Sequence, residues 1–241
     1  MNKKLTSLNM GILLGASLFL TSVQAKDNQI TAPETHLSYT SSVISATGVK
    51  TVRNDTLDPS DVLFIFADLH PDLIASSNTM SPSALAANAG GLAKVAHAIK
   101  APSLFLTVPR NGKPGELLPE LQPYATAENT IYRENADPFR VKQIVDAIKK
   151  SGKHTLIVSG YTSEVAVMLT ALGALDNGYR VLIPVDCIGN RSARTEDAAL
   201  ARTAQAGAQI TSLASVAAQL APDFSKEPGT TILSVILDAK L

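Results

Sequence analysis

Residues 155–167 read TLIVSGYTSEVAV, which is a short apolar run, a glycine and the first turn of an expected helix. An apolar run of this length next to a glycine is typical of a strand buried on both faces. Residues 162–177 are apolar nearly all round and are followed by Gly178, which predicts a helix buried in the domain or at a subunit interface. The turn at Gly160 therefore joins a buried strand to a helix, whose amino end offers free N–H groups.

The same alternation of strand and helix continues along the chain. Apolar or short β-prone runs predict further strands at 62–67, 104–108, 130–132, 181–185 and 209–211. Helical segments are expected at 81–100, 138–151, 195–206 and 213–220, and a proline-rich loop at 109–123 is long enough to cover a site. This order predicts an α/β fold, a three-layer, doubly wound and mainly parallel sheet with helices on both faces. Such sheets bind ligands at the carboxyl ends of their strands, where Asp68, Pro109, Arg133, Gly160 and Asp186 stand.

Residues 1–25 have the features of a secretory signal peptide. Lys3 and Lys4 precede an apolar stretch at 10–23, and Val23-Gln24-Ala25 offers the small residues of a cleavage site. The apolar stretch is shorter than the about 20 residues of a membrane span, so no membrane association is expected after cleavage. We expect a periplasmic or secreted protein with an N-terminal arm at 26–57, a domain at 58–222 and an apolar tail at 223–241.

Composition narrows the classes of partner. Residues 1–25 contain two lysines and no acidic residue, so their removal changes the net charge from 0 to −2. This nearly neutral charge does not indicate the basic surface that binds nucleic acid. The chain has no tryptophan and one cysteine, Cys187, which cannot form a disulfide within the chain. The four histidines are scattered and no dinucleotide or phosphate-loop motif follows a strand, so neither a metal nor a cofactor is expected. A small polar molecule is the expected ligand.

Several ordered motifs together resemble one family. They are Asp68 in ADLHPDL, Arg133 in IYRENADPF, the stretch GYTSEVAVMLTALGALDNGYRVLIPVD from Gly160, and the later RTEDAALARTAQAGAQITSLASVAAQL. Over residues 60–222 this pattern is similar to that of the isochorismatase-like (cysteine hydrolase) superfamily. Its members typically show Asp-x-Gln after a strand, then a basic residue, then G-x-x-T-[DE]-x-C-V before a helix.

The resemblance implies a set of site residues. Asp68 matches the general acid or base, Arg133 matches the basic residue, and Ala166 stands where the family usually has its nucleophilic cysteine. Residues 160–164 match the oxyanion turn, which is often associated with a cis peptide. The residues expected to bind substrate are His70, which replaces the common glutamine, together with Tyr161, Thr162 and Ser163. Asp186 resembles a structural aspartate, and the family implies a homo-oligomer.

The departures from the family pattern disfavour its covalent amidase chemistry. The methyl group of Ala166 cannot attack a carbonyl carbon, and the guanidinium of Arg133 cannot accept a proton. Three interpretations stay open: a non-catalytic ligand-binding or assembly protein, Asp68-dependent hydrolysis without a covalent intermediate as in isochorismatases proper, and a substitute nucleophile among Ser163, Thr162 and Cys187.

Simpler roles compete with these functional ones. Ser163 and Thr162 are more often helix caps, and a lone cysteine such as Cys187 is more often a small buried residue. His70 is more often a capping or packing residue, and Arg133 can equally be a solvated surface cation.

Overall fold

The computed structural model describes residues 42–44, 50–52 and 56–240, and the signal-like residues 1–25 lie outside them. The chain divides into two compact units, residues 1–53 and 54–241. In the first unit, β1 (Ser42–Ile44) and β2 (Lys50–Val52) form an antiparallel pair. Both strands lie within the N-terminal arm expected at residues 26–57.

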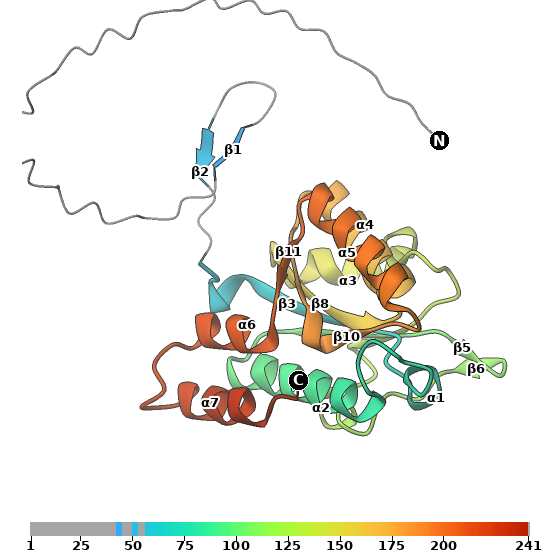
Figure 1. The fold of residues 1–241 in the computed structure, drawn as a ribbon, viewed down its shortest axis with the longest axis horizontal. Coiled ribbons are helices and arrows are strands. Elements are labelled where there is room, and N and C mark those ends of the chain that lie inside the picture. The colour runs from blue at the N-terminus through green and yellow to red at the C-terminus, as the bar shows by residue number, and fades with distance from the viewer. Residues whose placement is uncertain (1–41, 45–49, 53–55, 241) are drawn as a thin grey trace, which may run out of the picture. The chain divides into compact units, whose positions relative to one another are not determined.

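The second unit is built on a parallel sheet (Figure 1). Its strand order is β11-β9-β8-β3-β4-β7, with β10 added beside β8, and every pairing within it is parallel. The strands are β3 (Val62–Ala67), β4 (Ser103–Thr107), β7 (Thr130–Tyr132), β8 (Thr155–Tyr161), β9 (Arg180–Pro184), β10 (Ile188–Gly189) and β11 (Gln209–Thr211). The predicted doubly wound α/β fold is confirmed.

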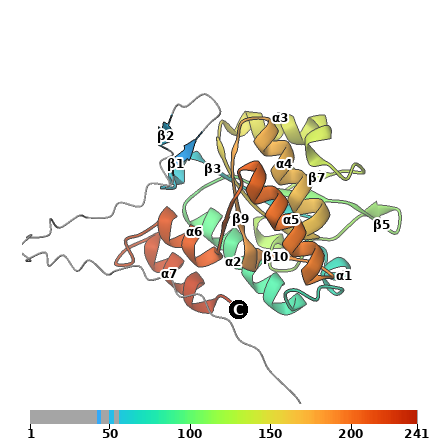
Figure 2. The same cartoon turned by 45° about the horizontal axis from the view of Figure 1, so that its top comes forward.

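Helices cover both faces of this sheet, as Figures 1 and 2 show. Along β3 the side chains alternate between the two faces, because successive residues of a strand point in opposite directions. Val62, Phe64 and Phe66 face one core, which is closed by α2 (Pro82–Ala98), α6 (Leu213–Leu220) and α7 (Gly229–Asp238). Leu63, Ile65 and Ala67 face the other, which is closed by α3 (Lys142–Ser151), α4 (Met168–Asp176) and α5 (Ala193–Ala206).

The C-terminal tail, for which the sequence pattern indicated no position, forms α7 against α2 and α6. Asn88 of α2 binds the end of this tail, since its Oδ1 accepts from the N–H of Lys240 and its Nδ2 donates to the Lys240 carbonyl, both at 2.8 Å. Nδ2 also donates to the carbonyl of Asp186 at 2.8 Å. One buried amide thus joins the tail, α2 and the segment after β9.

Four elements differ from the sequence prediction. The helix expected at 138–151 is a 3-10 turn, Pro138–Arg140, followed by α3, because Val141 between them has an extended backbone. The helix expected at 162–177 begins with a π-helical turn, Ser163–Val167. The loop at 109–123 contains a hairpin, β5 (Pro109–Arg110) and β6 (Lys113–Pro114), whose turn is an Asn-Gly pair with positive φ. A short helix, α1 (Pro71–Ile74), follows β3 and was not expected.

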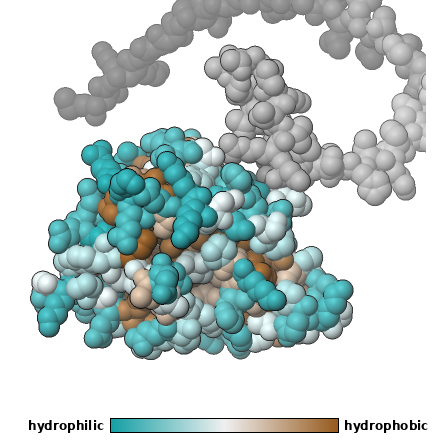
Figure 3. Space-filling view, turned by 180° about the vertical axis from the view of Figure 1, so that it is seen from behind, coloured by the Kyte–Doolittle hydropathy of each residue, from teal (hydrophilic) through white to brown (hydrophobic). Residues whose placement is uncertain are grey.

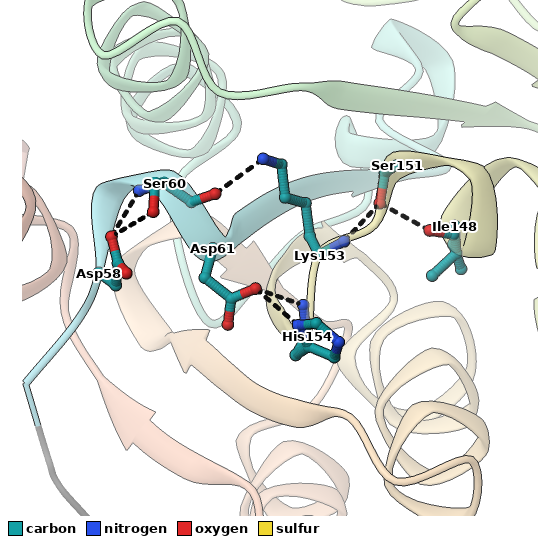
Figure 4. A network of polar contacts seen from close by, with 7 residues as sticks. All are labelled: Asp58, Ser60, Asp61, Ile148, Ser151, Lys153 and His154. Carbon is teal, nitrogen blue, oxygen red and sulfur yellow. Dashed lines mark hydrogen bonds and ion pairs between the residues drawn. The ribbon is translucent and has the colours of Figure 1, made fainter.

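A polar network joins the amino ends of β3 and β8 (Figure 4). Asp61 Oδ1 accepts from the backbone N–H of His154 at 2.9 Å and lies 2.8 Å from its Nδ1. Lys153 Nζ donates to the carbonyl of Ser60 at 2.7 Å. These bonds precede the first register pair of the two strands and stabilise their alignment at the edge opposite the carboxyl ends.

The exterior is mostly polar on the face that Figure 3 presents, with small apolar areas between hydrophilic side chains. No helix within residues 56–240 combines the length and the hydropathy of a bilayer-crossing segment.

Candidate functional site

Asp68 lies at the carboxyl edge of the sheet. It follows β3 directly, and its N–H donates to the carbonyl of Leu106 in β4 at 3.0 Å. The preceding residue, Ala67, is in register with Gly160 of β8, so Asp68 stands between the ends of β8 and β4. Its φ of +60° is in the left-handed region, which aspartate tolerates better than most residues. The local turn therefore directs a buried carboxylate, 6% exposed, out of the strand path.

Arg133 reaches Asp68 from two strands away. It follows β7, and its N–H donates to the carbonyl of Thr107 at the end of β4 at 2.9 Å. Because β4 lies between β3 and β7, the two backbones are separated by about 10 Å, a distance that the long arginine side chain can span. Its Nη2 donates to Asp68 Oδ2 at 2.5 Å, and Nη1 donates to the carbonyl of Asn135. Arg133 is 2% exposed, so the alternative of a solvated surface cation is wrong.

The Asp68–Arg133 pair includes two polar atoms that have no hydrogen-bond partner in the part of the chain that the structure describes. These are Asp68 Oδ1 and Arg133 Nε, which are both buried. Burial raises the pKa of Asp68 from 3.8 to about 6, although the charge and hydrogen bond of Arg133 act in the opposite direction. Burial also lowers the pKa of Arg133. The carboxyl group can therefore gain and lose a proton near neutral pH, and its free oxygen can act on a bound molecule.

Ala166 lies in the first turn after β8, the strand next to β3. Gly160 is the second-last residue of β8. A Cβ at this position would lie 2.6 Å from the carbonyl oxygen of Ala67, so only glycine allows the backbones of β8 and β3 to come this close. The peptide bond between Tyr161 and Thr162 is cis. Ala166 is 1% exposed and belongs to the same apolar cluster as Ala67. The position that resembles the family's nucleophile thus carries a buried methyl group beside the end of the Asp68 strand.

Two of the predicted substrate-binding hydroxyls have protein partners. Tyr161 is buried in the core on the α2 side, and its hydroxyl lies 2.8 Å from Ser76 Oγ. Ser163 Oγ lies 2.6 Å from Glu196 Oε2 and 3.0 Å from the carbonyl of Gly189.

The expected capping role is wrong for both residues of the turn. Thr162 is at the N-cap position without a side-chain cap bond, and the hydroxyl of Ser163 bonds elsewhere. Thr162 is half-buried, and its hydroxyl does not cap the helix.

His70, the remaining predicted substrate-binding residue, is fully buried, and its two ring nitrogens contact the backbone on either side of the β5–β6 hairpin. Its Nδ1 lies 2.7 Å from the carbonyl of Glu116, and its Nε2 lies 3.3 Å from the backbone nitrogen of Val108. Burial lowers the pKa of His70. The ring is held by backbone groups and does not present a free nitrogen.

Asp186 and Cys187 are buried and lie in the turn that follows β9. Burial raises the pKa of the Cys187 thiol, and its Sγ lies 3.6 Å from the carbonyl of Asn88. Asp186 Oδ1 accepts from the N–H of Leu213 at 2.7 Å and so holds the start of α6. A buried protonated thiol is a poor nucleophile, which weakens the case for Cys187.

The sequence analysis missed residues that orient the site through the backbone or from distant elements. Asn135 holds Arg133 by its carbonyl, and Glu116 holds His70 by its carbonyl. Glu196 of α5 joins Ser163 to Thr79, whose hydroxyl donates to Glu196 Oε2 at 3.1 Å. A carbonyl contact leaves no trace in residue type, but a glutamate early in a helix that faces the site turn is a signal that spacing could have revealed.

Comparisons with known proteins agree with this geometry. The family model described as the isochorismatase domain matches residues 62–215. The "probable hydrolase YcaC" of Escherichia coli is 29% identical over 172 residues, 71% of this chain and 83% of that protein. A structure of YcaC from Pseudomonas aeruginosa with hexane-2,5-diol and covalent acrylamide has a TM-score of 0.73 and 28% identity, and the match covers 78% of this chain and 94% of that one.

The crystal structure of YcaC from Escherichia coli, described as an octameric hydrolase of unknown specificity, likewise has a TM-score of 0.73. It is 27% identical, and the match covers 78% of this chain and 93% of that one. The family model spans more than half of the chain and all the strands of the central sheet. The parallel sheet, the order of the motifs and the family match together establish that this chain belongs to the isochorismatase family.

Proposed function

We propose that this chain hydrolyses a small polar molecule at the Asp68–Arg133 site without forming a covalent intermediate. The observation that carries the proposal is the asymmetry of the Asp68 carboxyl group. Oδ2 is held by Arg133, whereas Oδ1 is buried and has no hydrogen-bond partner within residues 56–240. Natural proteins rarely keep a buried polar atom unpaired unless it has a further role.

In the proposed reaction Asp68 is the proton donor. The raised pKa of Asp68 keeps part of the carboxyl groups protonated near neutral pH, which suits general acid catalysis. Asp68 donates its proton to the oxygen or nitrogen of the leaving group, and water adds to the carbon that carries this group. The carbon–heteroatom bond then breaks, the leaving group departs with the proton it received, and the proton lost by the water returns to Asp68. Arg133 stays charged throughout, orients the carboxyl group and stabilises its ionised form between the two proton transfers.

The residue at position 166 supports a route without a covalent intermediate. A methyl group offers no nucleophile, and the other candidates are engaged in the fold: Ser163 contacts Glu196, and Cys187 is buried with a raised pKa. Thr162 keeps the least constrained hydroxyl of this turn and is the alternative that the experiment must exclude.

The experiment is hydrolysis of a set of small amides, esters and enol ethers by the protein without residues 1–25. Products are followed by mass spectrometry in ¹⁸O-water, and the intact protein is weighed during turnover. We expect label in the product, no added mass on the protein, and at least about a hundredfold loss of rate in Asp68→Asn. Asp146→Asn, at an exposed aspartate of α3 that pairs with Lys142, is the matched control and should keep its rate.

Two other outcomes would reject the proposal. A covalent adduct that disappears in Thr162→Val would assign a substitute nucleophile. Compounds that raise the melting temperature but are never consumed would support the non-catalytic, ligand-binding interpretation instead.

We also propose that the protein is exported and assembles as a homo-oligomer. The basic start, the short apolar stretch and the small residues at 23–25 support export. The half-buried apolar residues of α4, and the octamer described for the Escherichia coli relative, support assembly. A mature amino terminus at Lys26 in the secreted or periplasmic fraction tests the first point, and light scattering of that protein tests the second.

A further inference from the structure

The loop at 109–118 folds back onto the segment that follows Asp68. The N–H of Gly115 donates to the carbonyl of Val108 at 3.0 Å, and the N–H of Leu118 donates to the carbonyl of Leu69 at 3.1 Å. Between the hairpin of this loop and α1 is a recess of about 420 Å³, which Arg110 and Asp72 border. The guanidinium of Arg110 and the carboxylate of Asp72 are 2.5 Å apart across it. The loop thus packs against the residues that directly follow Asp68.

His70 is enclosed beneath this loop, and its two neighbours determine its tautomer. A backbone carbonyl can only accept a hydrogen bond, so Nδ1, 2.7 Å from the Glu116 oxygen, must carry a proton. A backbone N–H can only donate, so Nε2, 3.3 Å from the Val108 nitrogen, must carry a lone pair. The ring therefore joins the two ends of the hairpin only while it is neutral.

Gly115 allows the ring to sit this close. A Cβ at residue 115 would lie 2.8 Å from His70 Cε1 and Nδ1, and 2.8 Å from Arg110 Cγ. The loop backbone passes directly over the imidazole, with no space for a larger residue. His70, Gly115 and the two hydrogen bonds to the backbone together hold the loop in place. A change in the protonation of the ring therefore changes the contacts that hold the loop.

We propose that His70 is a positioning residue that holds the 109–118 loop closed over the approach to Asp68 and releases it when the imidazole is protonated. A second proton on Nε2 would place two N–H groups against each other at Val108, so the bond that anchors the start of the loop is lost. The proposal concerns access and does not depend on which reaction occurs at Asp68.

The charges around His70 favour the neutral ring at ordinary pH. Burial is the main cause of its lowered pKa. Arg110 of the hairpin and Arg133 after β7 also oppose protonation, whereas Asp72 of α1 and the carbonyl of Glu116 favour it. Because the closed form binds fewer protons than the open form, closure is complete above the ordinary histidine pKa of 6.5 and is lost as the pH falls below it.

The experiment is hydrogen exchange of the amides between Val108 and Leu118 from pH 7.5 to pH 4.5, corrected for intrinsic rates, in the full domain. The matched variant is His70→Gln, whose amide offers one donor and one acceptor but does not titrate in this range. We expect equal protection of the two proteins at pH 7.5. As the pH falls below the ordinary histidine pKa of 6.5, the ratio of the wild-type exchange rate to that of the glutamine variant should rise about tenfold per pH unit, until the pH reaches the lowered pKa of His70 in the closed form.

A second pair of variants separates this role from plain packing. His70→Ala should lose loop protection at every pH, and His70→Gln should restore it. Gly115→Ala should open the loop at pH 7.5 in a protein that keeps its sheet amides protected, which covers the case in which the histidine variants fold poorly. A wild-type to His70→Gln ratio that stays constant with pH, or a loop that remains protected in Gly115→Ala, would overturn the proposal.

Discussion

Arg133 Nη2 lies 2.5 Å from Asp68 Oδ2, across the end of the strand that separates their own two strands. Removing the cation would leave a buried carboxylate without a counter-charge. We predict that Arg133→Met lowers the free energy of unfolding at pH 7 by about 3–5 kcal/mol, measured by urea denaturation. The double variant Asp68→Asn with Arg133→Met should lose less than the single Arg133→Met variant, because it buries no charge. A larger loss in the double variant would show that the pair is not coupled in this way.

The raised pKa of Asp68 predicts a pH dependence with a definite sign. Its pKa is 3.8 in the unfolded chain and about 6 in the folded protein, so the folded state binds the proton more tightly. The resulting stabilisation is complete below pH 3.8 and is lost as the pH rises through about 6. Relative to Asp68→Asn, the wild type should lose about 3 kcal/mol of unfolding free energy between pH 3.5 and pH 7.5.

Using the difference between these two proteins removes the contributions of other titrating groups. His70 acts in the opposite direction, since its lowered pKa means that acid destabilises the closed form, but it is present in both proteins. A difference that does not change with pH would mean that Asp68 titrates with an ordinary pKa.

A cysteine at position 166 should be a reactive thiol. We predict that Ala166→Cys forms a covalent adduct with acrylamide, because a thiol in the first turn of a helix has a lowered pKa and the turn lies at the strand end beside Asp68. The wild type should form none, since Cys187 is buried and its pKa is raised. Ala171→Cys, in the buried part of α4, is the matched control. Mass spectrometry should show modification at 166 at least about tenfold faster than at 171, and equal rates would argue against an accessible site at this turn.

The amide of Asn88 should be important for the C-terminal helix. It makes three bonds of 2.8 Å, two of them to Lys240. We predict that Asn88→Ala lowers the free energy of unfolding by about 3 kcal/mol, at about 1 kcal/mol for each lost bond. It should also let carboxypeptidase shorten the tail. Asn177→Ala loses one exposed bond and should change stability by less than about 0.5 kcal/mol, which makes it the control.

The central strands could be predicted from the sequence because each is an apolar run that the fold buries on both faces. β3 was predicted with its observed bounds, and β7 likewise, whereas β8 extends two residues beyond its apolar run into the turn at Gly160. Features that depend on local turn chemistry were harder. The hairpin of the 109–118 loop has the Asn-Gly signal of a tight turn, but its flanking strands are only two residues long.

The site was predictable only in part, for a reason of topology. Asp68 and the turn at Gly160 belong to adjacent strands, so the position of one implies the other. Arg133 contacts Asp68 because β4 lies between β3 and β7, and no local sequence pattern predicts this strand order. The partner of His70 is a backbone carbonyl of a distant loop, which sequence spacing does not identify.

The left-handed backbone at Asp68 also limits how this position can vary. At a φ of +60°, glycine and asparagine fit with little strain, whereas β-branched and most other side chains are disfavoured by about 1–2 kcal/mol. A saturation library at codon 68 should therefore yield well-expressed protein mainly for aspartate, asparagine and glycine. Few side chains are therefore tolerated at residue 68, and sequence diversity is better introduced at residues 133 and 166.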